Sequence, residues 1–140
     1  MQNLKAFKKL DAAGSPLSAP GRDGIWLLDD DASMLKALGR LLNSAGFAVE
    51  KFNRPADFLS MLKQRDCRVA VLDVWMPDMN GLEVQACLRR DSPATRIIFI
   101  TGRDDPSVRQ TALDAGAFGF LAKPFEDEVL LQLINKAVTG

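Results

Sequence analysis

The sequence predicts an α/β fold: a single doubly wound sheet of five parallel strands with helices on both faces. Between residues 24 and 138, short apolar runs alternate five times with segments whose apolar residues recur at helical spacing. Such alternation is typical of parallel strands joined by right-handed helical crossovers. The runs at 25–28, 69–72 and 97–100 are apolar throughout, as expected of strands covered on both sides.

The first half of the pattern begins with a strand over 25–28. Helical spacing follows it and lasts until Gly46, a residue type that commonly ends helices. A weak alternation predicts the second strand over 47–51. Pro55, which suits the first turn of a helix, opens the second helix over 55–62.

The second half repeats the strand and helix signals three times. Gly116 marks the end of one helix, and acidic residues open the last helix, where the helix dipole favours them. The predicted elements are a strand over 69–72, a helix after Gly81, a strand over 97–100, a helix over about 106–115, a strand over 118–122 and a helix over 126–138.

The length of 140 residues suits one domain, which we place at residues 24–140. Residues 1–23 differ in composition, with a short lysine-rich amphipathic turn followed by a Gly, Ser and Pro-rich stretch. We expect an N-terminal extension or linker there. A solvated extension is favoured over a turn that touches a membrane or a partner.

Composition excludes several classes of function. Lys plus Arg and Asp plus Glu both number 18, so the formal charge is zero and direct nucleic-acid binding is not expected. The absence of histidine removes His-based catalytic triads and His metal sites. Cys67 and Cys87 have no metal-site spacing and indicate thiols of a reducing compartment. No run is long enough to span a membrane, so we expect a cytoplasmic protein.

Polar residues stand at the ends of four predicted strands. Asp29 and Asp30 follow the first strand, Asp73 the third, Thr101 the fourth and Lys123 the fifth. If the strands take the common order 2-1-3-4-5, the order reverses between the first and third strands, where ligands bind. Each residue taken alone has a structural explanation, such as a turn, a helix cap or a solvated charge. Their joint placement favours a site.

The chemistry of these side chains indicates a phosphoryl group next to Mg²⁺. Carboxylates gathered closely repel one another unless a cation joins them or one is protonated. A cluster of oxygens without His or Cys suits a hard ion, Mg²⁺ before Ca²⁺. Lys123 supplies a positive charge and Thr101 a hydroxyl donor for an anion, and Asp73 can then act as a nucleophile that forms an acyl phosphate. Asp31 is expected to cap the first helix instead.

Four motifs follow one another between residues 24 and 138: Leu28-Asp-Asp30, Leu72-Asp-Val-Trp-Met-Pro-Asp-Met-Asn-Gly81, Ile100-Thr-Gly102 and Lys123-Pro-Phe125. With these motifs the segment resembles the receiver domain of two-component response regulators, whose flavodoxin-like sheet has the order assumed above. The residues around Thr101 and Lys123 look most like those of the branch often fused to helix-turn-helix output domains or found in hybrid sensor kinases.

The resemblance implies that Asp73 is the phospho-acceptor. It would take the phosphoryl group from a phosphohistidine on a sensor histidine kinase or a phosphotransfer protein. It also implies Mg²⁺ as the cofactor, with Asp30 as a direct ligand, Asp29 holding water ligands, and Asp73 and the backbone carbonyl of Trp75 completing the protein ligands.

Further roles follow from the same resemblance. Thr101 and Lys123 would bind the phosphoryl oxygens, and the Lys123-Pro124 bond would be cis, which only an X-Pro bond permits at low cost. Phe120 would be an aromatic switch that turns inward when Thr101 moves toward the phosphate. That movement would reshape the face formed by the fourth helix, fifth strand and fifth helix, with a phosphorylation-dependent homodimer as one outcome.

Two positions depart from the commonest family pattern, and two rival functions stay open. Trp75 is bulky and predicts slow self-dephosphorylation, while Arg103 could bias the lifetime of the same acyl phosphate or contact a partner.

A phosphatase of the haloacid dehalogenase type would need a second Asp where Trp75 stands. A receiver-fold interaction module without phosphorylation is the other rival. We expect no enzyme beyond assistance to its own phosphotransfer and dephosphorylation.

Overall fold

The computed structural model describes residues 24–139 and contains a five-stranded parallel sheet in the order β2-β1-β3-β4-β5. The predicted fold class and strand order are therefore confirmed. The elements of the described residues are β1 (Ile25–Leu28), α3 (Ala32–Ser44), β2 (Val49–Phe52), α4 (Pro55–Leu62), β3 (Val69–Asp73), α5 (Gly81–Asp91), β4 (Arg96–Thr101), α6 (Pro106–Asp114), β5 (Gly119–Ala122) and α7 (Asp127–Thr139).

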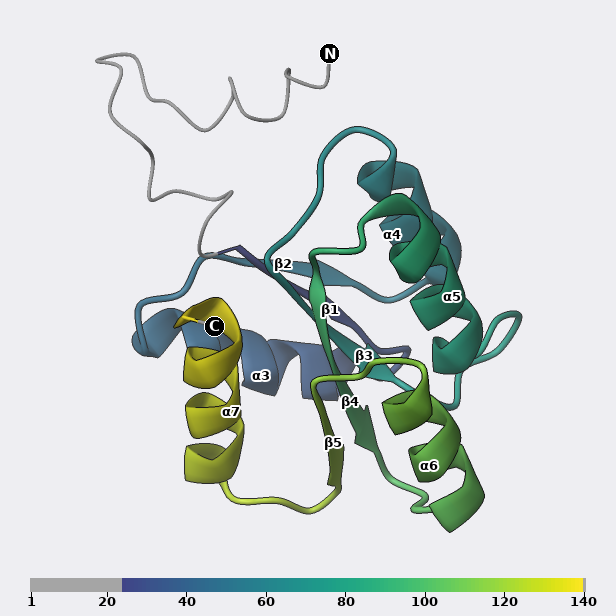
Figure 1. The fold of residues 1–140 in the computed structure, drawn as a ribbon. Coiled ribbons are helices and arrows are strands. Elements are labelled where there is room, and N and C mark those ends of the chain that lie inside the picture. Colours follow the sequence, from purple (N-terminus) through teal and green to yellow (C-terminus); the bar gives the residue numbers. More distant parts are fainter. Residues whose placement is uncertain (1–23, 140) are drawn as a thin grey trace.

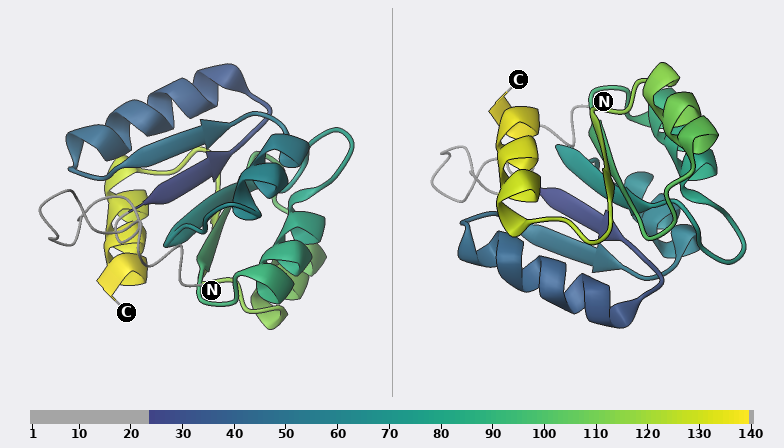
Figure 2. Two further views of the ribbon diagram at one scale, coloured as in Figure 1. Left: turned by 90° about the horizontal axis from the view of Figure 1, so that it is seen from above. Right: turned by 90° about the horizontal axis from the view of Figure 1, so that it is seen from below.

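The sheet lies between two layers of helices. Helices α3 and α7 cover one face, while α4, α5 and α6 cover the other (Figures 1 and 2). Each face has its own apolar cluster, one around Leu42, Ile98 and Ile134 and the other around Phe58, Leu88 and Phe99. Because both faces are covered, the central strands β1 and β3 are buried along their whole length, which explains their uninterrupted apolar runs.

The second strand is shifted from its predicted position of 47–51 and runs instead from Val49 to Phe52. The reason lies in the end of α3. Gly46 adopts a left-handed φ of 95°, and the amide of Phe47 donates to the carbonyl of Leu42, so the helix-ending turn includes Phe47. Pairing with β1 starts only where Val49 lies beside Ile25.

The helix caps show which acidic residues have a structural role and which do not. Asp31 is the N-cap of α3, since its Oδ1 accepts hydrogen bonds from the amides of Ser33 and Met34. The expected capping role of Asp31 is therefore confirmed, and Asp30 is not used as the cap. At α5, Asn80 and Glu83 form a reciprocal capping box that anchors the loop after β3.

Gly81 lies where that loop returns to the strand. Its amide donates to the carbonyl of Val74 at 2.8 Å. A Cβ at this position would overlap the carbonyl oxygen of Asp73 and would lie 3.0 Å from the ring of Phe99. Only a residue without a side chain therefore lets α5 start against the end of β3.

Gly81→Ala is expected to lower the free energy of unfolding by about 1–3 kcal/mol, because backbone atoms must move to relieve the overlap. Urea unfolding of the two proteins measures the difference. Gly102→Ala is the matched control, since the nearest atom to its added Cβ is 3.9 Å away. An equal loss in both variants would show that close packing at Gly81 is not the cause.

Several sequence-based expectations concern the rest of the chain. Cys67 is buried and Cys87 half-buried, and both are free thiols. Among the described residues, no helix has the length and apolar character needed to cross a membrane. The predicted N-terminal extension, residues 1–23, lies outside the described residues.

Candidate functional site

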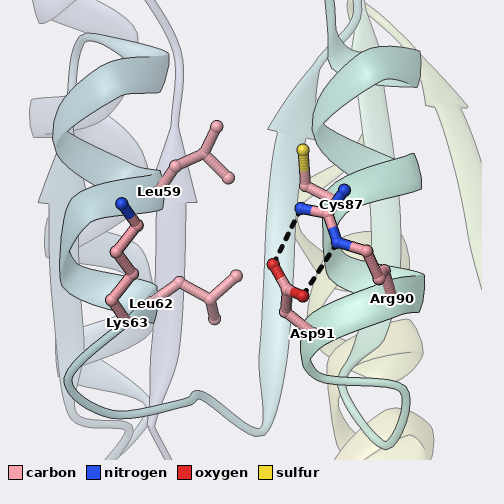
Figure 3. Close-up of a pocket in the computed structure, with 6 residues that line it drawn as sticks. All are labelled: Leu59, Leu62, Lys63, Cys87, Arg90 and Asp91. Carbon is pink, nitrogen blue, oxygen red and sulfur yellow. Dashed lines mark hydrogen bonds and ion pairs between the residues drawn. The ribbon is translucent and has the colours of Figure 1, made fainter.

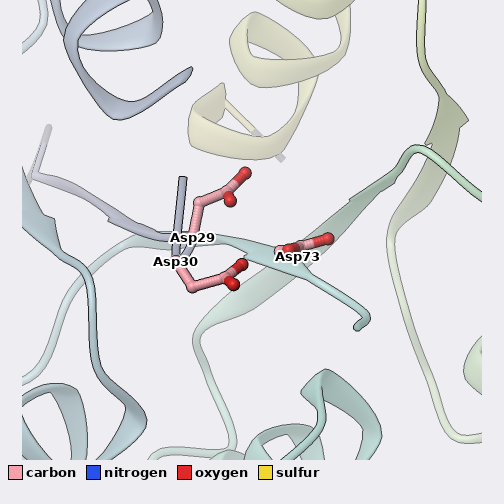
Figure 4. A group of neighbouring side chains, drawn as sticks. All are labelled: Asp29, Asp30 and Asp73. Atoms are coloured by element: carbon pink, nitrogen blue, oxygen red, sulfur yellow. The ribbon is translucent and has the colours of Figure 1, made fainter. Parts of the chain in front are cut away.

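The three predicted carboxylates meet at the carboxyl ends of β1 and β3. Asp29, Asp30 and Asp73 each offer an oxygen atom, and these oxygens all lie within 4.8 Å of one another (Figure 4). Adjacent strands bring them together, since β1 and β3 pair up to Leu28 and Leu72. Asp29 and Asp73 are only 4% and 7% exposed, whereas Asp30 reaches solvent. The strand ends thus form a cluster of oxygen ligands open on one side.

Lys123 reaches this cluster from the far side of β4. It follows β5, and its peptide bond to Pro124 is cis, as expected. Its amide donates to the carbonyl of Thr101 at 2.7 Å, while its Nζ lies 3.3 Å from Asp29 Oδ2. The other oxygen of Asp29 accepts a hydrogen bond from the amide of Asp31 at 2.9 Å. One buried carboxylate therefore positions the cation beside Asp73.

The surroundings of Asp73 favour its protonated form. Burial first, and then the neighbouring charge of Asp29, raise the pKa of Asp73 from 3.8 to about 7, against the opposing effect of Lys123. A hydrogen bond with Asp30 adds to the rise. The cluster therefore carries more negative charge than the protein alone compensates.

This excess charge and the donor set fit a hard divalent cation. All the clustered ligand atoms are carboxylate oxygens, which Mg²⁺ prefers, and a cation among them would relieve the repulsion that raises the pKa of Asp73. Asp29 already accepts hydrogen bonds at both oxygens, so Asp30 and Asp73 have the greater capacity for direct ligation.

The carboxylates line one hollow of about 350 Å³ at the edge of the sheet. Its shape is open, which suits a site that a partner must reach. The lining residues are Asp29, Asp30, Asp31, Asp73, Trp75, Gly102, Arg103 and Lys123.

Thr101, predicted to bind the phosphoryl oxygens, does not line this hollow. It is fully buried at the end of β4. Its hydroxyl donates to the carbonyl of Arg103 at 3.0 Å and accepts from the amide of Arg103 at 3.1 Å. The hydroxyl is thus engaged with its own loop rather than directed at Asp73.

Trp75 and Arg103, the two departures from the family pattern, contact each other across the hollow. The indole Nε1 of Trp75 donates to the carbonyl of Arg103 at 3.3 Å. The guanidinium of Arg103 lies 4.3 Å from the centroid of the Trp75 ring, a cation–π distance. The loop after β3 and the loop after β4 are therefore joined by two residues that line the hollow.

Phe120 is already buried, with an exposed fraction of 8%. The centroids of the Phe120 and Phe99 rings lie 5.9 Å apart. The guanidinium of Arg109 lies 4.8 Å from the centroid of the Phe120 ring, and its Nη2 is 2.9 Å from both carboxylate oxygens of Asp104. Arg109 could not be predicted from the sequence, because one arginine on a helix carries no signal of the ring it covers.

A second depression lies between α4 and α5 and has about 410 Å³ (Figure 3). Its one carboxylate, Asp91, is paired with Arg90 at 2.9 Å, and it shares no residue with the acidic hollow. It lacks the clustered carboxylate oxygens of the first site. The lining residues are Leu59, Leu62, Lys63, Cys87, Arg90 and Asp91.

Fold and site together define a doubly wound α/β protein with an acidic pocket at the reversal of strand order. Residues 25–135 match the family model of the response regulator receiver domain. The response regulator protein TodT of Pseudomonas putida is 41% identical over 114 residues, covering 81% of this chain and 50% of TodT. The chain belongs to the family of response regulator receiver domains.

Solved structures agree with this assignment. A response regulator receiver protein from Burkholderia phymatum is 39% identical, with a TM-score of 0.74, and the match covers 83% of this chain and 94% of that one. The BeF₃-activated DrrB receiver domain is 31% identical, with a TM-score of 0.76, covering 84% and 97%.

Family membership carries a general function. Receiver domains of response regulators are signalling domains that interact with sensor kinases and bind Mg²⁺ at an acidic pocket. The chain spans about half the length of TodT.

Proposed function

We propose that Asp73 accepts a phosphoryl group from a phosphohistidine, on a sensor histidine kinase or a phosphotransfer protein, with Mg²⁺ as cofactor. The observation that carries this proposal is the meeting of Asp73 with Asp29, Asp30 and Lys123 in one open hollow. Burial of Asp73 and its repulsion by Asp29 raise the pKa of Asp73, an unfavourable arrangement that a bound cation would offset.

In the proposed transfer, an Asp73 oxygen forms a bond to phosphorus while the phosphorus–nitrogen bond of phosphohistidine breaks. The electron pair of that bond stays on the imidazole, which takes up a proton. Lys123 lines the same hollow as Asp73, so its positive charge can offset the negative charge that develops on the phosphoryl oxygens. Trp75 and Arg103 restrict the approach of water over the acceptor.

The metal site would use Asp30 as a direct ligand, Asp29 through water, and Asp73 and the backbone carbonyl of Trp75. A bound Mg²⁺ supplies positive charge that offsets the carboxylates and the incoming phosphoryl group. Asp29 is suited to the water-mediated role because Lys123 and the amide of Asp31 already occupy its two oxygens.

The output proposed is a change in the face formed by α6, β5 and α7, driven by Thr101 and Phe120. Phe120 lies on β5 and is covered by Arg109 of α6, so a change at the end of β4 can reach this face. A homodimer formed on phosphorylation stays a prediction, as do a cytoplasmic location and the absence of direct nucleic-acid contact.

Incubation with acetyl phosphate and Mg²⁺, followed by intact mass measurement, tests the proposal. We expect one added phosphoryl group, which requires Mg²⁺ and is removed by hydroxylamine, because hydroxylamine cleaves acyl phosphates. No adduct from acetyl phosphate or from a phosphorylated kinase would reject phosphorylation and favour the interaction module. Turnover of a small phosphoester would instead favour the haloacid dehalogenase type of phosphatase.

Trp75→Ala is expected to shorten the lifetime of the acyl phosphate by about threefold to tenfold, equivalent to roughly 1 kcal/mol in the barrier to hydrolysis. The physical reason is that alanine removes the indole that covers the hollow and contacts Arg103. Intact mass followed over time measures the decay. A longer lifetime in Trp75→Ala than in the wild type would contradict the shielding role.

A further inference from the structure

The carbonyl of Arg103 has two donors in this structure. The hydroxyl of Thr101 donates to it at 3.0 Å and the indole Nε1 of Trp75 at 3.3 Å. The two donors come from different segments, the end of β4 and the loop after β3, and Arg103 lines the acidic hollow. A carbonyl oxygen has two lone pairs, so both bonds can exist together.

Occupation of Asp73 changes this arrangement. Thr101 is fully buried and its hydroxyl is turned to Arg103, so it can donate to a phosphoryl oxygen only if it leaves the Arg103 carbonyl. A hydroxyl has one proton and cannot serve both acceptors. The released carbonyl then depends on its second donor.

We propose that Trp75 is a positioning residue whose indole N–H keeps the Arg103 carbonyl bonded when the Thr101 hydroxyl turns to the phosphoryl group. The inference rests on the function proposed above and adds to it a second role for Trp75, distinct from excluding water. The indole lowers the free energy needed to release Thr101, because the carbonyl it leaves is not without a partner.

The stacking of Arg103 on Trp75 supports this role. The guanidinium lies 4.3 Å from the ring centroid, so the same two residues are held together by side chain and by backbone. The loop after β4 therefore keeps its attachment to Trp75 while Thr101 changes partner. Since the attachment needs the indole N–H and not only the ring, the two contributions can be separated by substitution.

A double-mutant cycle on the whole chain tests the proposal, with beryllofluoride and Mg²⁺ as the phosphoryl analogue. Affinity is followed by the amide NMR signal of Lys123, which neither substitution removes. Trp75→Phe keeps an aromatic ring but removes the N–H, and we expect it to weaken binding by about threefold, the effect of one modest hydrogen bond. In a Thr101→Val background the same change is expected to have no effect, since no hydroxyl leaves the carbonyl.

Thr101→Ser provides the rescue, because serine restores the hydroxyl and should restore the effect of Trp75→Phe. Urea unfolding of each variant separates folding losses from binding losses. Equal weakening by Trp75→Phe with and without the Thr101 hydroxyl, or no weakening in the wild-type background, would overturn the inference and leave the proposed function standing. Failure of the wild-type chain to bind beryllofluoride would overturn both.

Discussion

Asp73→Asn is expected to abolish the phosphoryl adduct formed with acetyl phosphate and Mg²⁺. The amide has nearly the size of the carboxylate but is not a nucleophile under these conditions, so no acyl phosphate can form. Asp73 is the residue of the cluster that Lys123 and both neighbouring acids surround. Intact mass of the two proteins, treated side by side, measures the adduct.

Asp78→Asn is the matched control for this experiment. Asp78 stands in the same loop, is exposed and has a left-handed φ of 71°, which asparagine adopts readily. We expect its adduct to equal that of the wild type. An adduct of equal size on Asp73→Asn would place the acceptor elsewhere, with Asp30 as the nearest exposed carboxylate.

The second large effect concerns stability. In the absence of Mg²⁺, Asp73→Asn is expected to raise the free energy of unfolding by roughly 4 kcal/mol at about pH 8 and to have little effect at about pH 4. The cause is the burial of Asp73 beside Asp29, which makes its ionised form unfavourable in the folded state. Urea unfolding at both pH values measures the difference.

The direction of this pH dependence follows from the number of protons bound by the folded and the unfolded states. The pKa of Asp73 is about 7 when folded and near 3.8 when unfolded, so the folded state binds more protons between these values. The contribution of Asp73 to stability is therefore lost as the pH rises from about 4 to about 7 and stays lost above it. Asparagine carries no charge and avoids this loss. Added Mg²⁺ should reduce the difference in the free energy of unfolding between Asp73→Asn and the wild type, because the ion stabilises the folded wild type with Asp73 ionised.

Asp105→Asn is a control whose expected effect on the free energy of unfolding has the opposite sign. Asp105 caps α6, and hydrogen bonds from Ser107 and then Val108 lower its pKa. Its contribution to stability is therefore present above its unfolded pKa and lost as the pH falls. A gain from Asp73→Asn that is the same at both pH values would contradict the raised pKa of Asp73.

Local pattern was sufficient for most of the fold. Strand and helix periodicity extends over consecutive residues, so the order of elements could be predicted, and the predicted sheet order is confirmed. The error at β2 arose because Phe47 has the composition of a strand residue but forms a hydrogen bond to the end of α3. Such a turn depends on where the helix ends in space.

The candidate site, like the fold, could be predicted from the sequence only in part. Parallel strands bring their carboxyl ends to one edge, so the meeting of Asp29, Asp30, Asp73 and Lys123 followed from their positions in the sequence. The orientation of the Thr101 hydroxyl did not, because its partner at Arg103 depends on the conformation of a loop. Arg109 over Phe120 was likewise beyond a reading of spacing.

The sequence by itself thus determined the fold class and, once the common strand order was assumed, the acids and lysine that gather at the sheet edge, because periodicity and strand polarity are local properties. Only the tertiary structure decided the pKa of Asp73, the pairing of Asp29 with Lys123 and the shared carbonyl of Arg103. These depend on burial and on hydrogen bonds between residues far apart in the chain, and both are set by the position of side chains in space.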